Sequence, residues 1–535
     1  MPCSACGSFN SDDAIYCGAC GAATQHQPSF IPVARHAVHG FGLDQTVTSN
    51  GRTEPVTVDA RADTLTADAR PATVPSDATR YLCAAVQLDS VLAERVIREI
   101  VDEEYKAPPR SPEVDLVQVL CHALSARGRQ LMRDVALLVV LIVFLVFVAA
   151  GVGLLLSVAI VLLLAWLVIV VEQLVTTYGV VARDLRPGRN APVAPPPSGS
   201  WAAHRLDQIG QYRYGNVTVG GSYNPFVGSG IPIDAWSFAL DMDRAAEGET
   251  AESFPVHEIH DYVLTRLNHL GLPGVSIDEQ VFVDGRDLHG DGRFLPHPLA
   301  PPVSHVDELL VRALTAAPED NARTYICLRV AGWHGQLVLS TFLRFVVTGQ
   351  NLFIELSHSL LTPILDHYQE VDHLLPQPTL RQFLRIAQRS VRQVPMGLVA
   401  APFALIRAIF RPISRGRRRA RQRREITTAL RFNYGSISSP RELASERSYQ
   451  RYFQQLDEAM YSKIVEKRLL EAIVTFLDDK GIDTHDLIER QTTILNEGVW
   501  VSGKGTLNAQ SVAAGPGARA KARVNKARAA SHRTG

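Results

Sequence analysis

The stretch VALLVVLIVFLVFVAAGVGLLLSVAIVLLLAWLVIVV (residues 135–171) decides how this chain is built, because its 37 residues include no charge. Ser157 is its only polar side chain. One straight helix of that length would measure about 55 Å, far more than a bilayer core of about 30 Å accommodates by tilting. Two shorter helices fit, with a turn at Ala149–Gly153. The stretch therefore predicts a transmembrane helical hairpin over residues 135–171.

Arginines flank this stretch on both sides: Arg127, Arg129 and Arg133 precede it, and Arg183, Arg186 and Arg189 follow it. Basic residues mark the cytoplasmic side of a membrane. We therefore expect a multi-pass protein of the inner (plasma) membrane with both termini in the cytoplasm. Arginine far outnumbers lysine, and alanine and valine are abundant, which is typical of a high-GC bacterial genome.

Four cysteines at the N-terminus form the pattern CxxC-x10-CxxC: Cys3, Cys6, Cys17 and Cys20. Four thiolates suit a closed, tetrahedral Zn²⁺ site, and a redox dithiol would normally accompany a βαβ pattern, which is missing here. We expect one structural zinc ion per chain. Residues 1–24 resemble the short zinc-ribbon modules at the N-termini of many bacterial membrane proteins. Cys83, Cys121 and Cys327 stand in apolar contexts and are predicted to be buried.

The remaining sequence divides into segments of different composition. Asp89 or Ser90 begins a predicted helix that extends to Tyr105. The predicted segments are a disordered linker (25–79), cytoplasmic helices (80–134), a Pro-rich linker (187–200), an α+β domain (201–375), an amphipathic membrane-surface segment (380–424), a helical pair (445–495), and short strands with a basic tail (496–535).

Residues 201–375 mix helical spacing with runs of β-branched and aromatic residues. Predicted strands cover residues 236–240, 279–283, 324–330, 336–347 and 352–356. Thr348-Gly-Gln-Asn351 between the last two is a hairpin turn. The fold class predicted for the whole chain is therefore multidomain: a zinc ribbon, a transmembrane hairpin, a cytoplasmic α+β domain with a largely antiparallel sheet, and a C-terminal helical pair.

Eight arginines and no acidic residue occupy the end of the amphipathic segment: Arg411, Arg415, Arg417, Arg418, Arg419, Arg421, Arg423 and Arg424. The preceding apolar residues 394–409 contain Pro395 and Pro402. A third membrane span would place the arginines outside, against the positive-inside rule. A surface helix whose arginines contact anionic lipid headgroups is favoured. Nucleic acid is the rival partner, although no aromatic residues alternate with the arginines as stacking platforms.

Four segments resemble large bacterial membrane proteins of an uncharacterised family that begin with a zinc ribbon. They are NVTVGGSYNPFVGSG (216–230), DEQVFVDG (278–285), RELASERSYQRYF (441–453) and ILNEGVWVSG (494–503). The resemblance implies no known activity and supplies no catalytic residues.

Sequence motifs for catalysis or cofactor binding are incomplete. Gly498–Lys504 lacks the hydroxyl residue that follows the lysine of a phosphate-binding loop. His257 and His260 lack the HExxH spacing of a zinc protease. We therefore assign no catalytic or cofactor-binding residues. The favoured function is a membrane-anchored, cytoplasm-facing adaptor or sensor that recruits a protein partner. An enzyme with a nonstandard site in residues 201–375 and a membrane-tethered nucleic-acid-binding protein remain the alternatives.

The zinc site leads to the first prediction. The purified chain should contain one Zn²⁺, and Cys17→Ala should lose it, because three thiolates leave the tetrahedron open. Metal analysis by mass spectrometry measures this, with Cys327→Ala as the control that keeps its zinc. Zinc content that is unaffected by Cys17→Ala would contradict the assignment.

Overall fold

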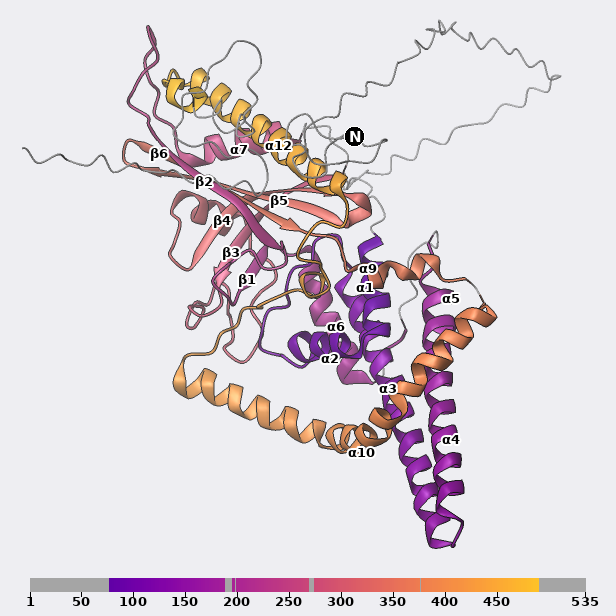
Figure 1. Cartoon of the computed structure of the whole chain (residues 1–535). Coiled ribbons are helices and arrows are strands. Elements are labelled where there is room, and N and C mark those ends of the chain that lie inside the picture. Colours follow the sequence, from indigo (N-terminus) through magenta and orange to yellow (C-terminus); the bar gives the residue numbers. More distant parts are fainter. Residues whose placement is uncertain (1–76, 188–194, 198, 269–273, 376, 490–535) are drawn as a thin grey trace, which may run out of the picture. The chain divides into compact units, whose positions relative to one another are not determined.

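The computed structural model describes residues 77–187, 195–197, 199–268, 274–375 and 377–489 (Figure 1). These residues all belong to one compact unit, residues 71–535. The predicted zinc ribbon (1–24), most of the predicted linker (25–79), and the tail (496–535) lie outside the described residues.

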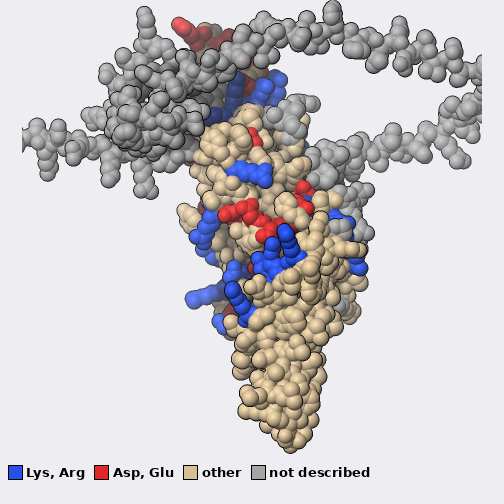
Figure 2. All heavy atoms as spheres, turned by 45° about the vertical axis from the view of Figure 1, so that its right-hand side comes forward, with Lys and Arg blue, Asp and Glu red and all other residues tan. Residues whose placement is uncertain are grey.

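Two antiparallel helices form the predicted hairpin: α3 (Leu116–Ala149) and α4 (Leu154–Leu174). The turn between them lies inside the predicted segment, and Gly151 has a φ of 74°, which favours glycine. Both helices, and a third over Leu380–Ala429, are long and apolar enough to cross a membrane. On the face seen in Figure 2, the lower part carries no charged side chain, and the charges gather above it. These features fit a membrane protein.

Both ends of the hairpin enter the same helical region. Its elements are α1 (Asp77–Leu88), α2 (Ser90–Val96), the π-helical η1 (Ile97–Val101) and η2 (Val175–Val181), α5 (Ala182–Asp184), α6 (Ser200–Gln211), the 3-10 turns η3 (Tyr212–Tyr214) and η5 (Glu370–His373), and α9 (Asp366–Gln369). Leu82, Leu120, Val181, Ile209 and Tyr368 share one buried core. Residues before α3 and after α4 therefore lie on the same side of the hairpin.

Helix α2 begins where the sequence predicts, because the Asp89 carboxylate accepts from the backbone N–H groups of Val91 and Leu92 at 2.8 and 3.1 Å. The predicted extension of this helix to Tyr105 is wrong. The helical residues end at Val101. The acidic residues 102–104 leave the helix and face arginines on another helix, an interaction between segments distant in the chain.

A six-stranded sheet forms the second region, with the order β1-β3-β4-β5-β6-β2. Its strands are β1 (Val217–Gly220), β2 (Ile231–Asp241), β3 (Val275–Asp284), β4 (Ala322–Gly332), β5 (Leu337–Thr348) and β6 (Asn351–Leu361). Only β1 and β3 pair in parallel. Thr348 pairs with Asn351 across the predicted two-residue turn. The prediction of a largely antiparallel sheet is confirmed.

One face of the sheet is covered by helices. Figure 1 shows α7 (Val256–Asn268) and α12 (Tyr452–Asp479) above it, and α8 (Glu308–Ala316) follows β3 in the chain. Ile259 and Val263 of α7 and Leu469 and Ile473 of α12 pack on the apolar residues of β4, β5 and β6. Helix α12 confirms the first member of the predicted helical pair. The second is described only from residue 485 to 489.

The other sheet face is covered in part by the loop before β2. Phe226, from the loop before β2, stacks on Phe342 of β5 with ring centroids 3.9 Å apart. Residues after α10 add to the free edge of β1, where Gly220 forms a parallel bridge to Ser436. The chains pass so closely that a Cβ at Gly435 would lie 2.2 Å from the Gly220 carbonyl oxygen.

Helix α10 (Leu380–Arg424) continues into the π-helical η6 (Glu425–Ala429) and contains three prolines, which remove backbone donors and bend a helix. Figure 1 shows the bend. Several contacts join α10 to α4. Trp166 donates to the Ala387 carbonyl (2.9 Å), Gln173 donates to Gln393 (2.7 Å), and Gly397 faces Ile169. Successive positions 387, 393 and 397 of α10 contact residues 166, 173 and 169 of α4. The contacted residue does not advance steadily along α4, so the two helices cross at an angle.

The close approach at Gly435 leads to a stability prediction. Gly435→Ala should destabilise the chain by about 1–3 kcal/mol, because the new methyl group meets backbone atoms that have no room to move. Thermal unfolding of the full chain in detergent measures this. Gly292→Ala is the matched control, since a Cβ there meets nothing within 4 Å. Equal melting temperatures for the two variants would contradict the observed packing.

Candidate functional site

The four predicted zinc ligands lie outside the described residues, so the zinc site stays a prediction. Within the described ranges, no group of three or more His, Cys, Asp or Glu side chains could hold a metal ion. Cys83, Cys121 and Cys327 are buried, as predicted. Burial raises the pKa of the Cys327 thiol to about 12, so this cysteine stays a protonated, apolar side chain at neutral pH.

The arginines predicted to bind lipid headgroups are largely paired with acidic residues of the same chain. Arg411 reaches Glu94 (3.1 Å) and Asp102 (3.2 Å), and Arg415 also reaches Asp102 (2.7 Å). Arg418 reaches Glu103 (3.0 Å), and Arg419 pairs with Glu104. Four arginines thus meet four carboxylates. We call this set the arginine–acid zipper.

Helical spacing explains why these four arginines act together. Positions 411, 415, 418 and 419 fall on one face of α10. The side chains of Asp102 and Glu103 are only 7% and 13% exposed, so their pairs are shielded from water. The Arg415 guanidinium also lies 4.6 Å from the ring centroid of Trp201, whose indole N–H donates to Glu104 (2.9 Å). The zipper therefore fastens α10 to the helical region.

The other arginines of the predicted cluster are more exposed. Arg421 pairs with Glu425 (2.9 Å), and Arg423 donates to the Tyr105 hydroxyl (3.0 Å). Arg417 and Arg424 show no hydrogen bond or ion pair to any described residue. Among the eight arginines predicted to contact headgroups, these two have guanidinium groups with no partner in the described part of the chain.

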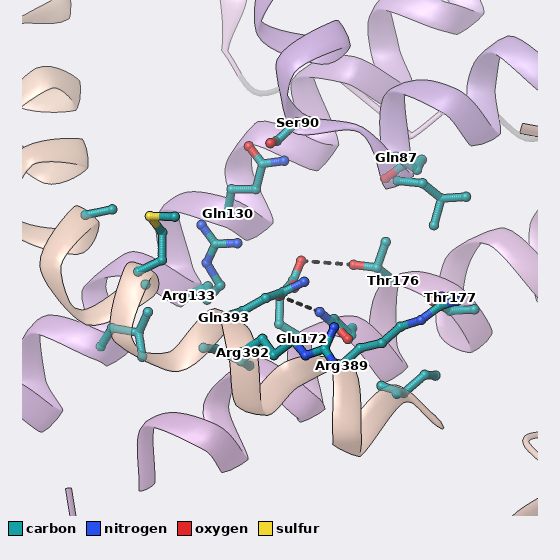
Figure 3. Close-up of a pocket in the computed structure, with 18 residues that line it drawn as sticks. Gln87, Ser90, Gln130, Arg133, Glu172, Thr176, Thr177, Arg389, Arg392 and Gln393 are labelled. Atoms are coloured by element: carbon teal, nitrogen blue, oxygen red, sulfur yellow. Dashed lines mark hydrogen bonds between the residues drawn. The ribbon is translucent and has the colours of Figure 1, made fainter. Parts of the chain in front are cut away.

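A cavity of about 620 Å³ lies where α1, α2, α3, α4 and α10 meet. Its polar lining residues are Gln87, Ser90, Gln130, Arg133, Glu172, Gln173, Thr176, Thr177, Arg389, Arg392 and Gln393. Its apolar lining comes from the inner ends of the hairpin and from the middle of α10, and includes Leu137, Ile169, Ile386 and Met396. Figure 3 shows Ser90 and Gln130 across the opening from Glu172 and Thr176. The lining of the cavity is therefore amphipathic, with both charged and apolar side chains.

The charges of this cavity are unbalanced. Arg133 donates to its neighbour Asp134 (2.8 and 3.0 Å), and Glu172 accepts from Thr176 (3.2 Å). Arg389 and Arg392 have no ion pair or hydrogen bond to a described residue. The lining therefore leaves two cations without a carboxylate.

Arg389 and Arg392 belong to a stripe of four arginines: Arg381, Arg385, Arg389 and Arg392. Spacings of four, four and three residues place them on one helical face. Sequence reasoning missed this stripe because it concentrated on the denser cluster at 411–424. The signal was available, since no acidic residue occurs between Asp372 and Glu425.

The cavity walls are held in place by hydrogen bonds between helices. The Ser390 hydroxyl donates to the Gln173 side chain (3.0 Å), which in turn donates to Gln393. Gly397 permits close approach, because a Cβ there would lie 3.3 Å from Ile169 and 3.4 Å from Leu137. Arg389 and Arg392 thus belong to a helix whose position against the hairpin is fixed by these contacts.

The sheet domain contains an arrangement with the composition of a catalytic relay. The Thr341 hydroxyl and His358 Nδ1 are 2.9 Å apart, and His358 Nε2 and Glu466 Oε1 are 3.1 Å apart. Thr341, His358 and Glu466 are 1%, 0% and 5% exposed. A substrate cannot reach the hydroxyl in this structure. The set therefore joins α12 to the sheet as an internal polar network.

The two histidines noted in the sequence, His257 and His260, lie in different environments. His257 is exposed, whereas His260 is buried and lies 2.6 Å from Glu279 of β3. This hydrogen bond lowers the pKa of Glu279. The pair fixes α7 on the sheet, and the two histidines do not come together as metal ligands.

Three of the four segments quoted for the resemblance meet on the loop-covered sheet face. Glu442, in α11 (Pro440–Leu443), accepts from the backbone N–H groups of Gly228 (2.8 Å) and Gly230 (3.0 Å). Phe226 packs edge-on against Phe282 of β3. The segments 216–230, 278–285 and 441–453 therefore form one structural unit, while 494–503 lies outside the described residues.

Comparisons with known proteins add a family to this description. Neither the curated proteins nor the solved structures contain a match to the chain. A family model described as an AbeC-like domain matches residues 235–510, just over half of the chain. The matched region begins within β2, after the hairpin, and includes β3 to β6 and α10 to α12. The chain therefore belongs to the family of proteins with an AbeC-like domain.

Proposed function

We propose that this protein is a membrane-anchored adaptor or sensor that works at the cytoplasmic face of the inner membrane. The position of α10 carries the proposal: it crosses the base of the apolar hairpin and is fastened to the helical region by the arginine–acid zipper. Residues on both sides of the hairpin share one core, which supports placing them on the same side. The flanking arginines support the cytoplasmic side.

In this proposal α10 lies in the headgroup layer. Its exposed apolar side chains include Val399, Phe403, Ile406 and Phe410, which repeat at helical spacing and form one face. Such a face inserts to the depth of the headgroup boundary. Arg417 and Arg424 are free to contact anionic lipids there. The zipper arginines are already neutralised, which supports a membrane function over nucleic-acid binding for this segment.

The sheet domain and the predicted zinc ribbon would then serve as the recruiting surfaces. The zinc ribbon is expected to fold around its metal and present a small, fixed surface to a protein partner. The α10 helix links the membrane directly to the AbeC-like domain, because α10 lies within the matched region. This continuity supports a sensing role.

The position of α10 can be measured by label depth. Cysteines at Val399, Ile406 and Phe410, each labelled with a nitroxide in the reconstituted full chain, should report the same shallow depth. The four N-terminal cysteines are replaced by serine. If α10 crossed the bilayer, the first and last labels would differ by up to about 16 Å. A label at Leu145, which is exposed in mid-hairpin, gives the deep reference.

The zipper can be tested by a double-mutant cycle. Glu103→Gln and Arg418→Gln should each destabilise the chain, with a coupling energy on the order of 1 kcal/mol, because the carboxylate is shielded from water. Unfolding of the full chain in detergent supplies the free energies. Glu308→Gln and Arg312→Gln are the matched cycle for an exposed pair, with an expected coupling of about 0.3–0.5 kcal/mol. Equal coupling in both cycles would show that the zipper does not fasten α10.

A further inference from the structure

The amphipathic cavity at the base of the hairpin has the features of a ligand site. Its volume of about 620 Å³ falls within the range of about 300–1,000 Å³ for small-molecule sites. It lies between five helices and stands at the level where charged residues give way to the uncharged hairpin. A ligand in this position would meet both charged and apolar side chains.

The arginines of the cavity lining favour an anionic ligand. Arg389 and Arg392 project from one face of α10, and they lack any carboxylate partner among the described residues. Arginine presents a planar fork of donors that matches the oxygens of a phosphate group. Glu172 is the acidic residue of the lining, and its carboxylate already accepts from Thr176. A single phosphate group would restore the charge balance.

The apolar lining favours a ligand with a hydrocarbon part. Leu137 and Ile169 are buried behind it, and the accessible apolar side chains of the lining are Leu88, Ile386 and Met396. These residues offer no hydrogen bond to a water-soluble phosphate compound. They would contact the first methylene groups of an acyl chain, and burying each of these is worth about 0.8 kcal/mol.

We propose that this cavity binds the phosphate headgroup of an anionic phospholipid, with Arg389 and Arg392 on the phosphate and Leu88, Ile386 and Met396 against the acyl chains. Basic pockets between membrane helices on the cytoplasmic side bind anionic lipid headgroups in this way. The proposal rests on the membrane anchoring proposed above. It adds a lipid class that the sensor would recognise and the residues that would recognise it.

The test is lipid titration of the delipidated full chain, read by native mass spectrometry. Phosphatidylglycerol should bind more tightly than phosphatidylcholine with the same acyl chains. The double variant Arg389→Gln/Arg392→Gln should bind phosphatidylglycerol about 25-fold more weakly, at about fivefold for each arginine. Both side chains are exposed and unpaired within the described chain, so the variant should keep its melting temperature.

A matched control separates this cavity from general charge attraction. Arg381→Gln/Arg385→Gln removes the other two arginines of the stripe, which are exposed and lie outside the cavity lining. This variant should keep most of its affinity, and an equal loss in both variants would overturn the proposal. Equal binding of glycerol phosphate, which has no acyl chain, would also overturn it in favour of a soluble phosphate ligand.

The label depths keep this proposal distinct from the anchoring proposal. If anchoring is correct and the cavity proposal is wrong, α10 labels stay shallow in every variant while lipid affinity does not change with Arg389 and Arg392. If anchoring itself is wrong, the wild-type labels report unequal depths. The two failures therefore give different results in different measurements.

Discussion

The constraint on which the rest of the structure depends is the need to satisfy backbone hydrogen bonds along 37 uncharged residues. Within lipid, only helices or closed barrels satisfy every backbone group. This run of residues is too long for one membrane-spanning helix and too short for two long ones. It therefore folds as a hairpin of two shorter helices, and Gly151 permits the turn between them. A hairpin returns the chain to the side from which it came. This is why residues 77–115 and 185–489 can share cores and why α10 can pack on both hairpin helices.

The two arginine groups of α10 illustrate how similar residues acquire different roles from their surroundings. The first group pairs with carboxylates that are partly shielded from water, so its charges are neutralised within the chain. This group consists of Arg411, Arg415, Arg418 and Arg419. Removing one partner of such a shielded pair costs more than removing an exposed one. Arg389 and Arg392 meet no carboxylate in the described chain and keep their charge for a ligand. Within one helix, tertiary context therefore separates structural arginines from available ones.

The sequence predicts what depends on local pattern, and it fails where distant segments meet. The turn near Gly151, the hairpin at Thr348–Asn351 and the antiparallel sheet follow from hydrophobicity, turn residues and β-branched runs. The helix predicted to reach Tyr105 ends at Val101, because the acidic residues beyond it meet arginines more than 300 positions later. Local spacing carries no information on such pairing. The cavity likewise needs helices from both sides of the hairpin, so only its arginine stripe was visible in the sequence.

The segment that follows α10 connects this helix to the sheet. After η6 the chain adds to the edge of β1, where the Ser436 N–H donates to the Val219 carbonyl (3.1 Å). It then places Arg441 in the interior, fully buried, with its guanidinium donating to the Gln336 carbonyl (2.6 Å) just before β5. Burial without a carboxylate lowers the pKa of Arg441 to about 9, so the group remains charged at neutral pH and depends on these carbonyl contacts.

Such a group resists displacement, because moving it would leave a buried charge without partners. A shift of α10 would therefore act on β1 and β5 through covalently continuous, tightly fixed backbone. Helix α12 comes next in the chain and is joined to the sheet by a contact between His358 and Glu466. The order of these elements connects α10 to the sheet through a short segment, so a displacement of this helix would be transmitted to the strands.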